Sequence, residues 1–254
     1  MAIEIVKLAL TLIVSIFGIF LVSGFIIGQL EHLNAIYIGK AFGRAGIFIT
    51  SFIGTPVHEF GHFIMCIIFR HQVVEVKWFR PIASQTDGIL GYVNHRYNPS
   101  NLYQNIGNFF IGMAPLFVGS LIIIILSRLL IPETFNTITH TKEISIKNVL
   151  SSIFTANNLK SISFWIFVFL SVSISTHMEL SSQDIKGSIS GIVAIIIIII
   201  LFSIIIKIFG IGTINIFQGI KLYNYAFGIV FLIGILFSLL TLIVSFLVSV
   251  VRGL

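Results

Sequence analysis

The chain has 254 residues, of which 57% are hydrophobic and only 9% are charged, and its mean hydropathy is +1.08. A soluble domain of this length carries about a quarter charged residues, so the composition excludes an ordinary water-soluble globular protein. The net charge is +6, but the 15 Lys and Arg are scattered over short polar segments. This scatter argues against nucleic acid as a partner and predicts contact with the headgroups of a lipid bilayer.

The apolar residues form long blocks, each near the roughly 20 residues that a helix needs to cross the hydrocarbon. These blocks occupy residues 5–28, 46–69, 106–131, 162–180, 189–209 and 225–251. We therefore predict an all-α polytopic membrane protein with about six transmembrane helices, folded as one integral membrane domain over residues 1–254. The bias towards Ile, Asn, Ser and Lys favours a multi-pass protein of a bacterial cell membrane.

The first block, 5–28, is longer than the roughly 7–15 apolar residues of a signal peptide, and no clear small-x-small cleavage site follows it. We expect it to be a retained span. The single cysteine, Cys66, excludes an internal disulfide framework and a cysteine-rich metal cluster. Its expected role is that of a small packing residue.

The second block contains the strongest motif of the chain, His58-Glu59-Phe60-Gly61-His62. Residues four apart share one face of a helix, so both imidazoles can reach one metal ion while Glu59 lies beside them. In that geometry a divalent metal acidifies a water and the carboxylate takes its proton as general base. The motif lies near mid-block, where ionisable side chains are costly and mark functional sites.

The connection 71–105 contains a run rich in β-forming residues at 73–79, the turn signal Asp87-Gly88 and a second apolar run at 89–93. This pattern predicts a short β-hairpin at the membrane surface. A tethering loop with interfacial aromatic residues remains the alternative. Asp87 fits a turn and is a poor candidate for a metal ligand.

The fourth block ends in a polar stretch, 175–187, which interrupts two apolar blocks. The purely apolar part before it is too short to cross a membrane, so part of the polar stretch must lie at membrane depth. Irregular backbone is tolerated there only where it is buried in protein or lines a wet cavity. Since catalytic zinc usually has three protein ligands, we predict Asp184 as the third ligand beside His58 and His62.

The role of His177 in the same stretch is open between an alternative metal ligand, a donor to the developing oxyanion or the substrate, and an interfacial histidine outside the site. We assign it to the catalytic residues. Glu179 is expected to be solvated near the headgroups.

With these residues the chain resembles the site-2 protease family of intramembrane zinc metalloproteases. The resemblance covers roughly residues 47–190 and is carried by the motif at 58–62, the segment 111–116 (Ile-Gly-Met-Ala-Pro-Leu) and the interrupted helix with Asp184. His177-Met178 and Asp184-Ile185 stand where the family usually has Asn-Pro-like and Asp-Gly pairs, so the chain looks like a divergent member.

The resemblance implies a three-span catalytic core at about 47–190, flanked by the spans 5–28, 189–209 and 225–251. It also implies a zinc cofactor and a substrate that is a membrane-embedded or signal-peptide-like polypeptide. A regulatory membrane partner that gates the site fits the same picture. Two alternatives remain: a metal-binding scaffold or transporter without proteolytic activity, and another membrane zinc protease in which Glu179 is the third ligand.

Overall fold

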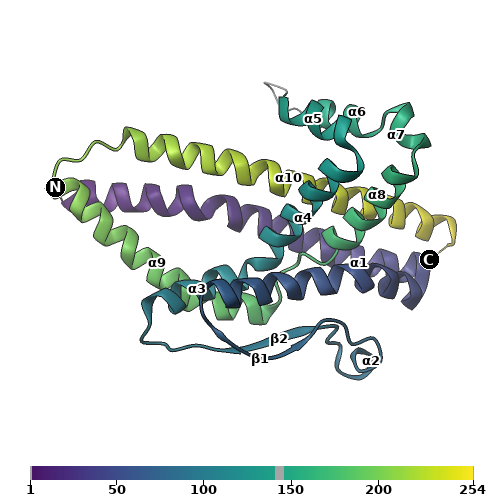
Figure 1. Ribbon diagram of the computed structural model, residues 1–254, viewed down its shortest axis with the longest axis horizontal. Coiled ribbons are helices and arrows are strands. Elements are labelled where there is room, and N and C mark those ends of the chain that lie inside the picture. The colour runs from purple at the N-terminus through teal and green to yellow at the C-terminus, as the bar shows by residue number, and fades with distance from the viewer. Residues whose placement is uncertain (1, 141–145, 254) are drawn as a thin grey trace.

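The computed structural model describes residues 2–140 and 146–253. Its elements are helices joined by short connections, with one small sheet (Figure 1). In chain order they are α1 (Ala2–Ile68), β1 (Gln72–Lys77), α2 (Ser84–Asp87), β2 (Tyr92–Arg96), α3 (Leu102–Gly112), α4 (Ala114–Leu130), α5 (Pro132–His140), α6 (Ile146–Ile153), α7 (Ala156–Lys160), α8 (Ile162–Ser175), α9 (Ser182–Ile208) and α10 (Ile214–Val251).

The first two predicted spans both lie in α1, which reverses direction at Gly43. This glycine has φ 65° and ψ −161°, values that interrupt the helix. A Cβ at Gly46 would lie only 3.1 Å from Cγ2 of Ile38, whereas these positions would be about 12 Å apart along a straight helix. The purple first part of α1 therefore doubles back into the blue second part, which carries residues 58–62 (Figure 1).

Within the described residues, α1, α9 and α10 are long and apolar enough to cross a membrane. The pair α3 and α4, bent by 60° at Met113, raises this number to four if it forms one span. The expected fourth span is shorter than predicted, because α8 has 14 residues and extends about 21 Å. An all-helical membrane protein is thus supported, while the number of six crossings stays a prediction.

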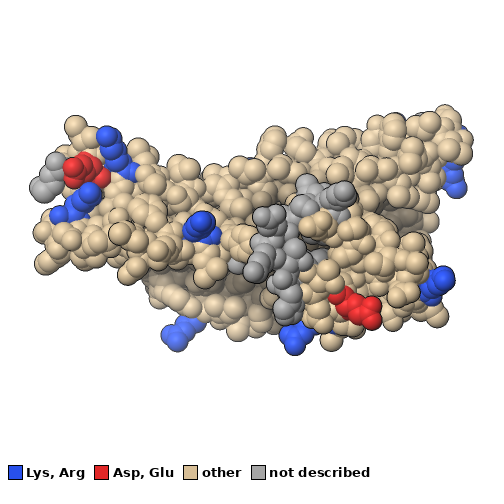
Figure 2. All heavy atoms as spheres, turned by 90° about the horizontal axis from the view of Figure 1, so that it is seen from above, with Lys and Arg blue, Asp and Glu red and all other residues tan. Residues whose placement is uncertain are grey.

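The surface agrees with a lipid environment. In the view of Figure 2, Lys, Arg, Asp and Glu are few and lie mostly towards the ends and edges, and most of the molecular surface is uncharged. Large apolar side chains on α1, α9 and α10 are more than half exposed, among them Phe25, Leu201 and Val251. Such an apolar surface is unfavourable in water and suits a bilayer.

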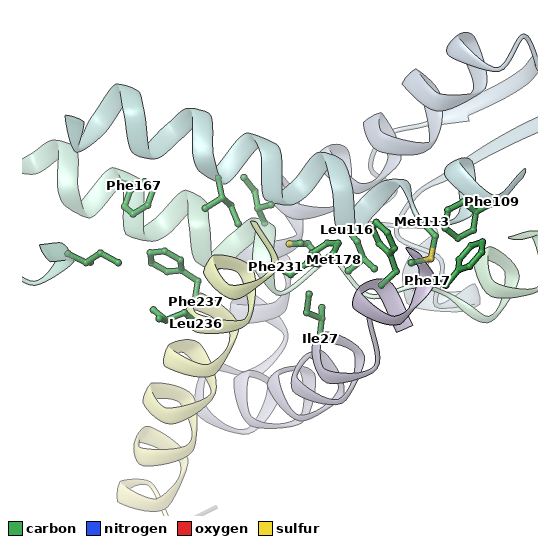
Figure 3. Close-up of a cluster of buried hydrophobic side chains, with 14 of the residues drawn as sticks. Phe17, Ile27, Phe109, Met113, Leu116, Phe167, Met178, Phe231, Leu236 and Phe237 are labelled. Atoms are coloured by element: carbon green, nitrogen blue, oxygen red, sulfur yellow. The ribbon is translucent and has the colours of Figure 1, made fainter. Parts of the chain in front are cut away.

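The interior is formed by α1, α4, α8 and α10, whose buried aromatic and aliphatic side chains meet in one cluster (Figure 3). Phe20 of α1 is 1% exposed and contacts Phe117 of α4 and Phe231 of α10 with ring centroids 4.8 and 5.5 Å apart. Met178, in the connection between α8 and α9, is buried in the same cluster. The polar stretch 175–187 is thereby fixed to the core.

The predicted β-hairpin is present: β1 and β2 pair antiparallel, with a bulge between Val73 and Glu75. Its second strand begins at Tyr92, three residues later than predicted. Asp87-Gly88 is not a two-residue hairpin turn, because it ends the one-turn helix α2 with Gly88 at φ 73°. Trp78, next to β1, makes an edge-to-face contact with Phe63 of α1, with ring centroids 5.4 Å apart, so the sheet is held against the helix that carries the metal-binding motif.

Candidate metal centre

Two elements bring the predicted ligands together. The second part of α1 carries His58 and His62 one turn apart on one face, and the first turn of α9 carries Asp184. One ligand atom from each residue lies within 4.8 Å of the other two, and this is the group in the described part of the chain that could hold a metal ion. The predicted proximity of Asp184 to the histidine pair is therefore confirmed.

The distances suit a small metal ion. Nε2 of His62 lies 3.3 Å from Oδ1 of Asp184, Nε2 of His58 lies 3.9 Å from Oδ2, and the two Nε2 atoms are 3.1 Å apart. Ligand atoms that sit roughly 2.0–2.1 Å from a tetrahedral zinc are separated by about 3.3 Å. Two imidazoles and a carboxylate also form a usual ligand set of catalytic zinc.

The tautomers of both histidines follow from their second nitrogens. Nδ1 of His58 lies 2.8 Å from the carbonyl oxygen of His177, and Nδ1 of His62 lies 2.8 Å from that of Ile111. A carbonyl oxygen only accepts hydrogen bonds, so each Nδ1 must carry the proton. Each Nε2 then presents a lone pair, which is the arrangement that backbone partners impose on metal-ligating histidines.

The partner of His62 is available because of Pro115. In a continuous helix the carbonyl of Ile111 would accept from the N–H of residue 115, but proline has none. The helix breaks between α3 and α4, and the freed carbonyl of Ile111 accepts from His62 instead. The segment 111–116, which in the sequence stood out only for its resemblance to a family segment, thus orients His62 through the carbonyl of Ile111.

Asp184 is oriented by the beginning of its own helix. Ser181 caps α9: its hydroxyl accepts from the N–H of Asp184 at 3.1 Å, and Oδ2 of Asp184 accepts from the N–H of Ser181 at 2.8 Å. This reciprocal capping box fixes the carboxylate in one rotamer. The same geometry aims it at the two imidazoles.

Glu59 is 6% exposed and lies close enough to Asp184 for the charges of the two carboxylates to interact. Its other neighbour is Gly91, at the end of the connection that leads into β2. A Cβ at Gly91 would meet Cγ of Glu59 at 2.8 Å and Oε1 at 3.0 Å. The hairpin backbone therefore lies directly against the predicted general base.

The structure places the ring of His177 away from a direct role in the ligand group. Its Nε2 lies 2.9 Å from the hydroxyl of Ser51 in α1, and its Nδ1 donates to the carbonyl of Ser173 at 3.0 Å. What His177 supplies to the ligands is its backbone carbonyl, which accepts from His58. Its assignment as a catalytic side chain stays a prediction.

The remaining candidates behave as expected from the sequence. Cys66 is fully buried, in agreement with a packing role. Asp87 accepts from Arg80 at 2.7 Å and from the N–H of Ile89 at 2.9 Å, and these two bonds, the backbone one first, lower its pKa. Glu179 is not part of the metal-binding group.

Sequence reasoning missed a histidine pair at the base of the hairpin. Nδ1 of His71 and Nδ1 of His95 lie 3.0 Å apart, and Nε2 of His71 donates to the carbonyl of Gln104 at 2.9 Å. Burial, then the neighbouring His71 and His62, lower the pKa of His95 to about 4. A histidine in an alternating strand could have pointed to either face, so the pattern gave no signal for this contact.

Comparison of the chain with protein-family models, with curated proteins and with solved structures yields no match. The function must therefore be argued from the chemistry of the residues themselves.

Proposed function

We propose that this protein is an intramembrane zinc metalloprotease, a divergent relative of the site-2 proteases, which hydrolyses peptide bonds of membrane-embedded or signal-peptide-like polypeptides. The observation that carries the proposal is the convergence of the Nε2 atoms of His58 and His62 with the carboxylate of Asp184, next to the buried Glu59. This set combines a metal-binding group with a carboxylate at the position of a general base.

Zinc is the metal that we expect, because nitrogen ligands and a short, nearly tetrahedral spacing favour it over the oxygen-seeking magnesium or calcium. When bound, zinc supplies Lewis acidity, which acidifies a water and polarises a carbonyl. His58, His62 and Asp184 would hold it through Nε2, Nε2 and a carboxylate oxygen. The carbonyls of His177 and Ile111 keep both imidazoles in the ligating tautomer.

Glu59 would act on protons. In the proposed reaction its carboxylate accepts a proton from the attacking water and returns it to the leaving amine nitrogen. Burial of Glu59 among α1 and the hairpin limits competing contacts with bulk water. Asp184, as a ligand, and Glu59, as the base, then have separate roles although both are carboxylates.

The hairpin supports a polypeptide substrate. A transmembrane helix hides its peptide bonds in its own hydrogen bonds, so cleavage needs a locally extended segment. Each strand of the two-stranded sheet has one edge without a pairing strand in the described structure, and an extended segment could pair there. Since Gly91 touches Glu59, a strand added along β2 would pass near the metal-binding group.

The proposal includes multi-pass insertion in a bacterial membrane with six crossings: both parts of α1, the bent pair α3 and α4, α8 with the polar stretch, α9 and α10. The long apolar helices and the sparse surface charge support insertion in a membrane. A regulatory membrane partner that gates access belongs to the same proposal.

The experiment compares the purified wild-type protein with Glu59→Gln in lipid nanodiscs, with a panel of transmembrane and signal-peptide segments as substrates. We expect one zinc per chain in both proteins and cleavage only by the wild type. Cleavage by Glu59→Gln at the wild-type rate would refute the assignment of the base. Bound zinc without cleavage of any segment would favour a non-proteolytic scaffold or transporter.

A further inference from the structure

Glu31 is a buried acid that the proposed reaction does not use. It lies in the first part of α1, before the reversal at Gly43, and is only 3% exposed. Its Oε1 accepts a hydrogen bond from the backbone N–H of Met178, and its Oε2 has no partner among the described residues. A carboxylate at such depth is costly, and this cost is usually tolerated for a function.

The hydrogen bond of Glu31 reaches the metal-binding group through one peptide unit. The N–H that Glu31 accepts belongs to Met178, and the carbonyl on the other side of the same peptide bond belongs to His177. That carbonyl accepts from Nδ1 of His58 at 2.8 Å. Carboxylate, peptide group and imidazole therefore form one series of hydrogen bonds that ends at the Nε2 lone pair of His58.

Such a series is cooperative. A carboxyl oxygen that accepts from a peptide N–H polarises that peptide and increases the negative charge on its carbonyl oxygen, and the carbonyl becomes a better acceptor. The stronger bond to Nδ1 of His58 makes its Nε2 a better electron donor to a metal. Many metal-binding histidines contact a carboxylate directly for this purpose; here a peptide group lies between the two.

The connecting peptide is held rigidly on both sides. The side chain of Met178 is 1% exposed and packs between α4 and α10, where a Cβ at Gly119 would lie 2.9 Å from its Cγ and one at Gly234 would lie 3.4 Å from its Cε (Figure 3). The ring of His177 is held by Ser51 of α1. The peptide group therefore cannot rotate to other partners without moving the core.

We propose that Glu31 is a positioning residue of the metal centre, which tunes the donor strength and orientation of His58 through the peptide group between His177 and Met178. This inference rests on the proposed metal-binding function and extends it to a residue from a different part of α1. It also assigns a function to the contact between the first part of α1 and the stretch that precedes α9.

The test measures zinc affinity by chelator competition and the visible spectrum of the cobalt-substituted protein, neither of which depends on cleavage. Glu31→Leu removes the acceptor and should weaken zinc binding by about 10- to 100-fold, the usual effect of losing an outer-shell partner. Glu31→Gln keeps an acceptor oxygen at the same chain length but replaces the carboxyl group by an amide, and it should give an intermediate loss. Both should shift the cobalt absorption bands.

Asn34 provides the matched control. It lies on the same face of α1, is 1% exposed, and donates to the carbonyl and hydroxyl oxygens of Ser238 in α10 rather than to the peptide. Asn34→Leu should lower thermal stability and leave zinc affinity and the cobalt spectrum unchanged.

If Glu31→Gln has the zinc affinity and cobalt spectrum of the wild type, the inference about Glu31 is wrong, although the metal site itself is unaffected. Should Glu31→Leu not fold, the result for Glu31→Gln alone decides. An equal loss of affinity in Asn34→Leu would also overturn it, because the effect would then be one of general stability. A wild-type protein that binds no zinc would refute both this inference and the proposed function.

Discussion

The Nε2 atoms of His58 and His62 face each other at 3.1 Å, and in the neutral rings each Nε2 presents a lone pair, because each ring donates through Nδ1 to a backbone carbonyl. Two lone pairs at this distance repel unless a proton or a cation lies between them. Asp184 adds a carboxylate 3.3 Å from Nε2 of His62. The three groups therefore form a site whose electrostatics favour a cation.

From this geometry we predict one tightly bound zinc per chain, measured by elemental analysis of the purified protein. His62→Ala and Asp184→Ala should each lose it, since a two-ligand site is incomplete for zinc. Glu179→Ala is the control, because Glu179 lies outside the metal-binding group, and it should keep the metal. Loss of zinc in Glu179→Ala together with retention of zinc in Asp184→Ala would show that Glu179, and not Asp184, is the third ligand.

The absence of a side chain at Gly91 leaves room for the side chain of Glu59. A valine at this position would place carbon atoms within 3.0 Å of the Glu59 side chain, so we expect Gly91→Val to reduce cleavage by at least about tenfold through displacement of the base. Zinc content should stay at the wild-type level, because the atoms nearest to a Cβ at Gly91 belong to Glu59 and Thr55 and not to the ligands. Gly219→Ala, where a Cβ meets nothing within 4 Å, is the control and should cleave normally.

Substitution of His177 distinguishes the role of its ring from that of its backbone carbonyl. Every side chain at this position keeps the carbonyl that accepts from His58, so His177→Ala should retain zinc. The loss of the ring leaves Ser51 and the carbonyl of Ser173 without this partner, and we expect a lower melting temperature equivalent to about 1–3 kcal/mol. Normal zinc content with abolished cleavage would instead establish the ring as catalytic.

The docking of the hairpin should depend on pH through His95. The pKa of His95 is lowered to about 4 in the folded protein, against an ordinary value near 6.5. As pH falls, His95 is therefore protonated in the undocked hairpin before it is protonated in the docked one. The stabilisation is present above pH 6.5 and is lost as pH falls towards 4. The protection of backbone amides in residues 72–96, measured by hydrogen exchange relative to the intrinsic rate at each pH, should therefore be lower at pH 5 than at pH 7.5. The variant His95→Gln should remove this difference.

The local chemistry of the site was readable from the sequence. His58, Glu59 and His62 share a spacing that only a helix brings onto one face, and Asp184 stood out because few acids interrupt the apolar blocks. The structure brings Asp184 to the histidines and confirms the hairpin between β1 and β2.

Contacts between segments that are distant in the chain could not be predicted from the sequence. Glu31 belongs to a stretch that looked like an ordinary connection, and its bond to Met178 depends on how two parts of α1 fold against the core. Two consecutive spans at 5–28 and 46–69 already implied a reversal between them, but the sequence did not show that the helix continues to Gly43 and turns there. The block 162–180 overestimated the length of α8, because its last residues belong to the polar stretch 175–187 and the helix ends at Ser175.

The reversal at Gly43 leads to the last prediction. With φ 65° and ψ −161°, this residue occupies a backbone region that is essentially restricted to glycine, and a side chain there costs about 1–3 kcal/mol. No atom lies within 4 Å of a Cβ built at Gly43, so the cost comes from the backbone rather than from a clash. We expect Gly43→Ala to lower the melting temperature of the protein in detergent.

Gly18 is the matched control for this variant, because it lies in the same helix, has a helical conformation and leaves equal space for a Cβ. Gly18→Ala should stabilise the protein by roughly 0.5–1 kcal/mol through helix propensity. The two alanine variants should thus change stability in opposite directions. Equal effects of the same sign would show that α1 does not depend on the special backbone of Gly43, and the reversal that brings Glu31 and His58 to opposite sides of one peptide group would need another cause.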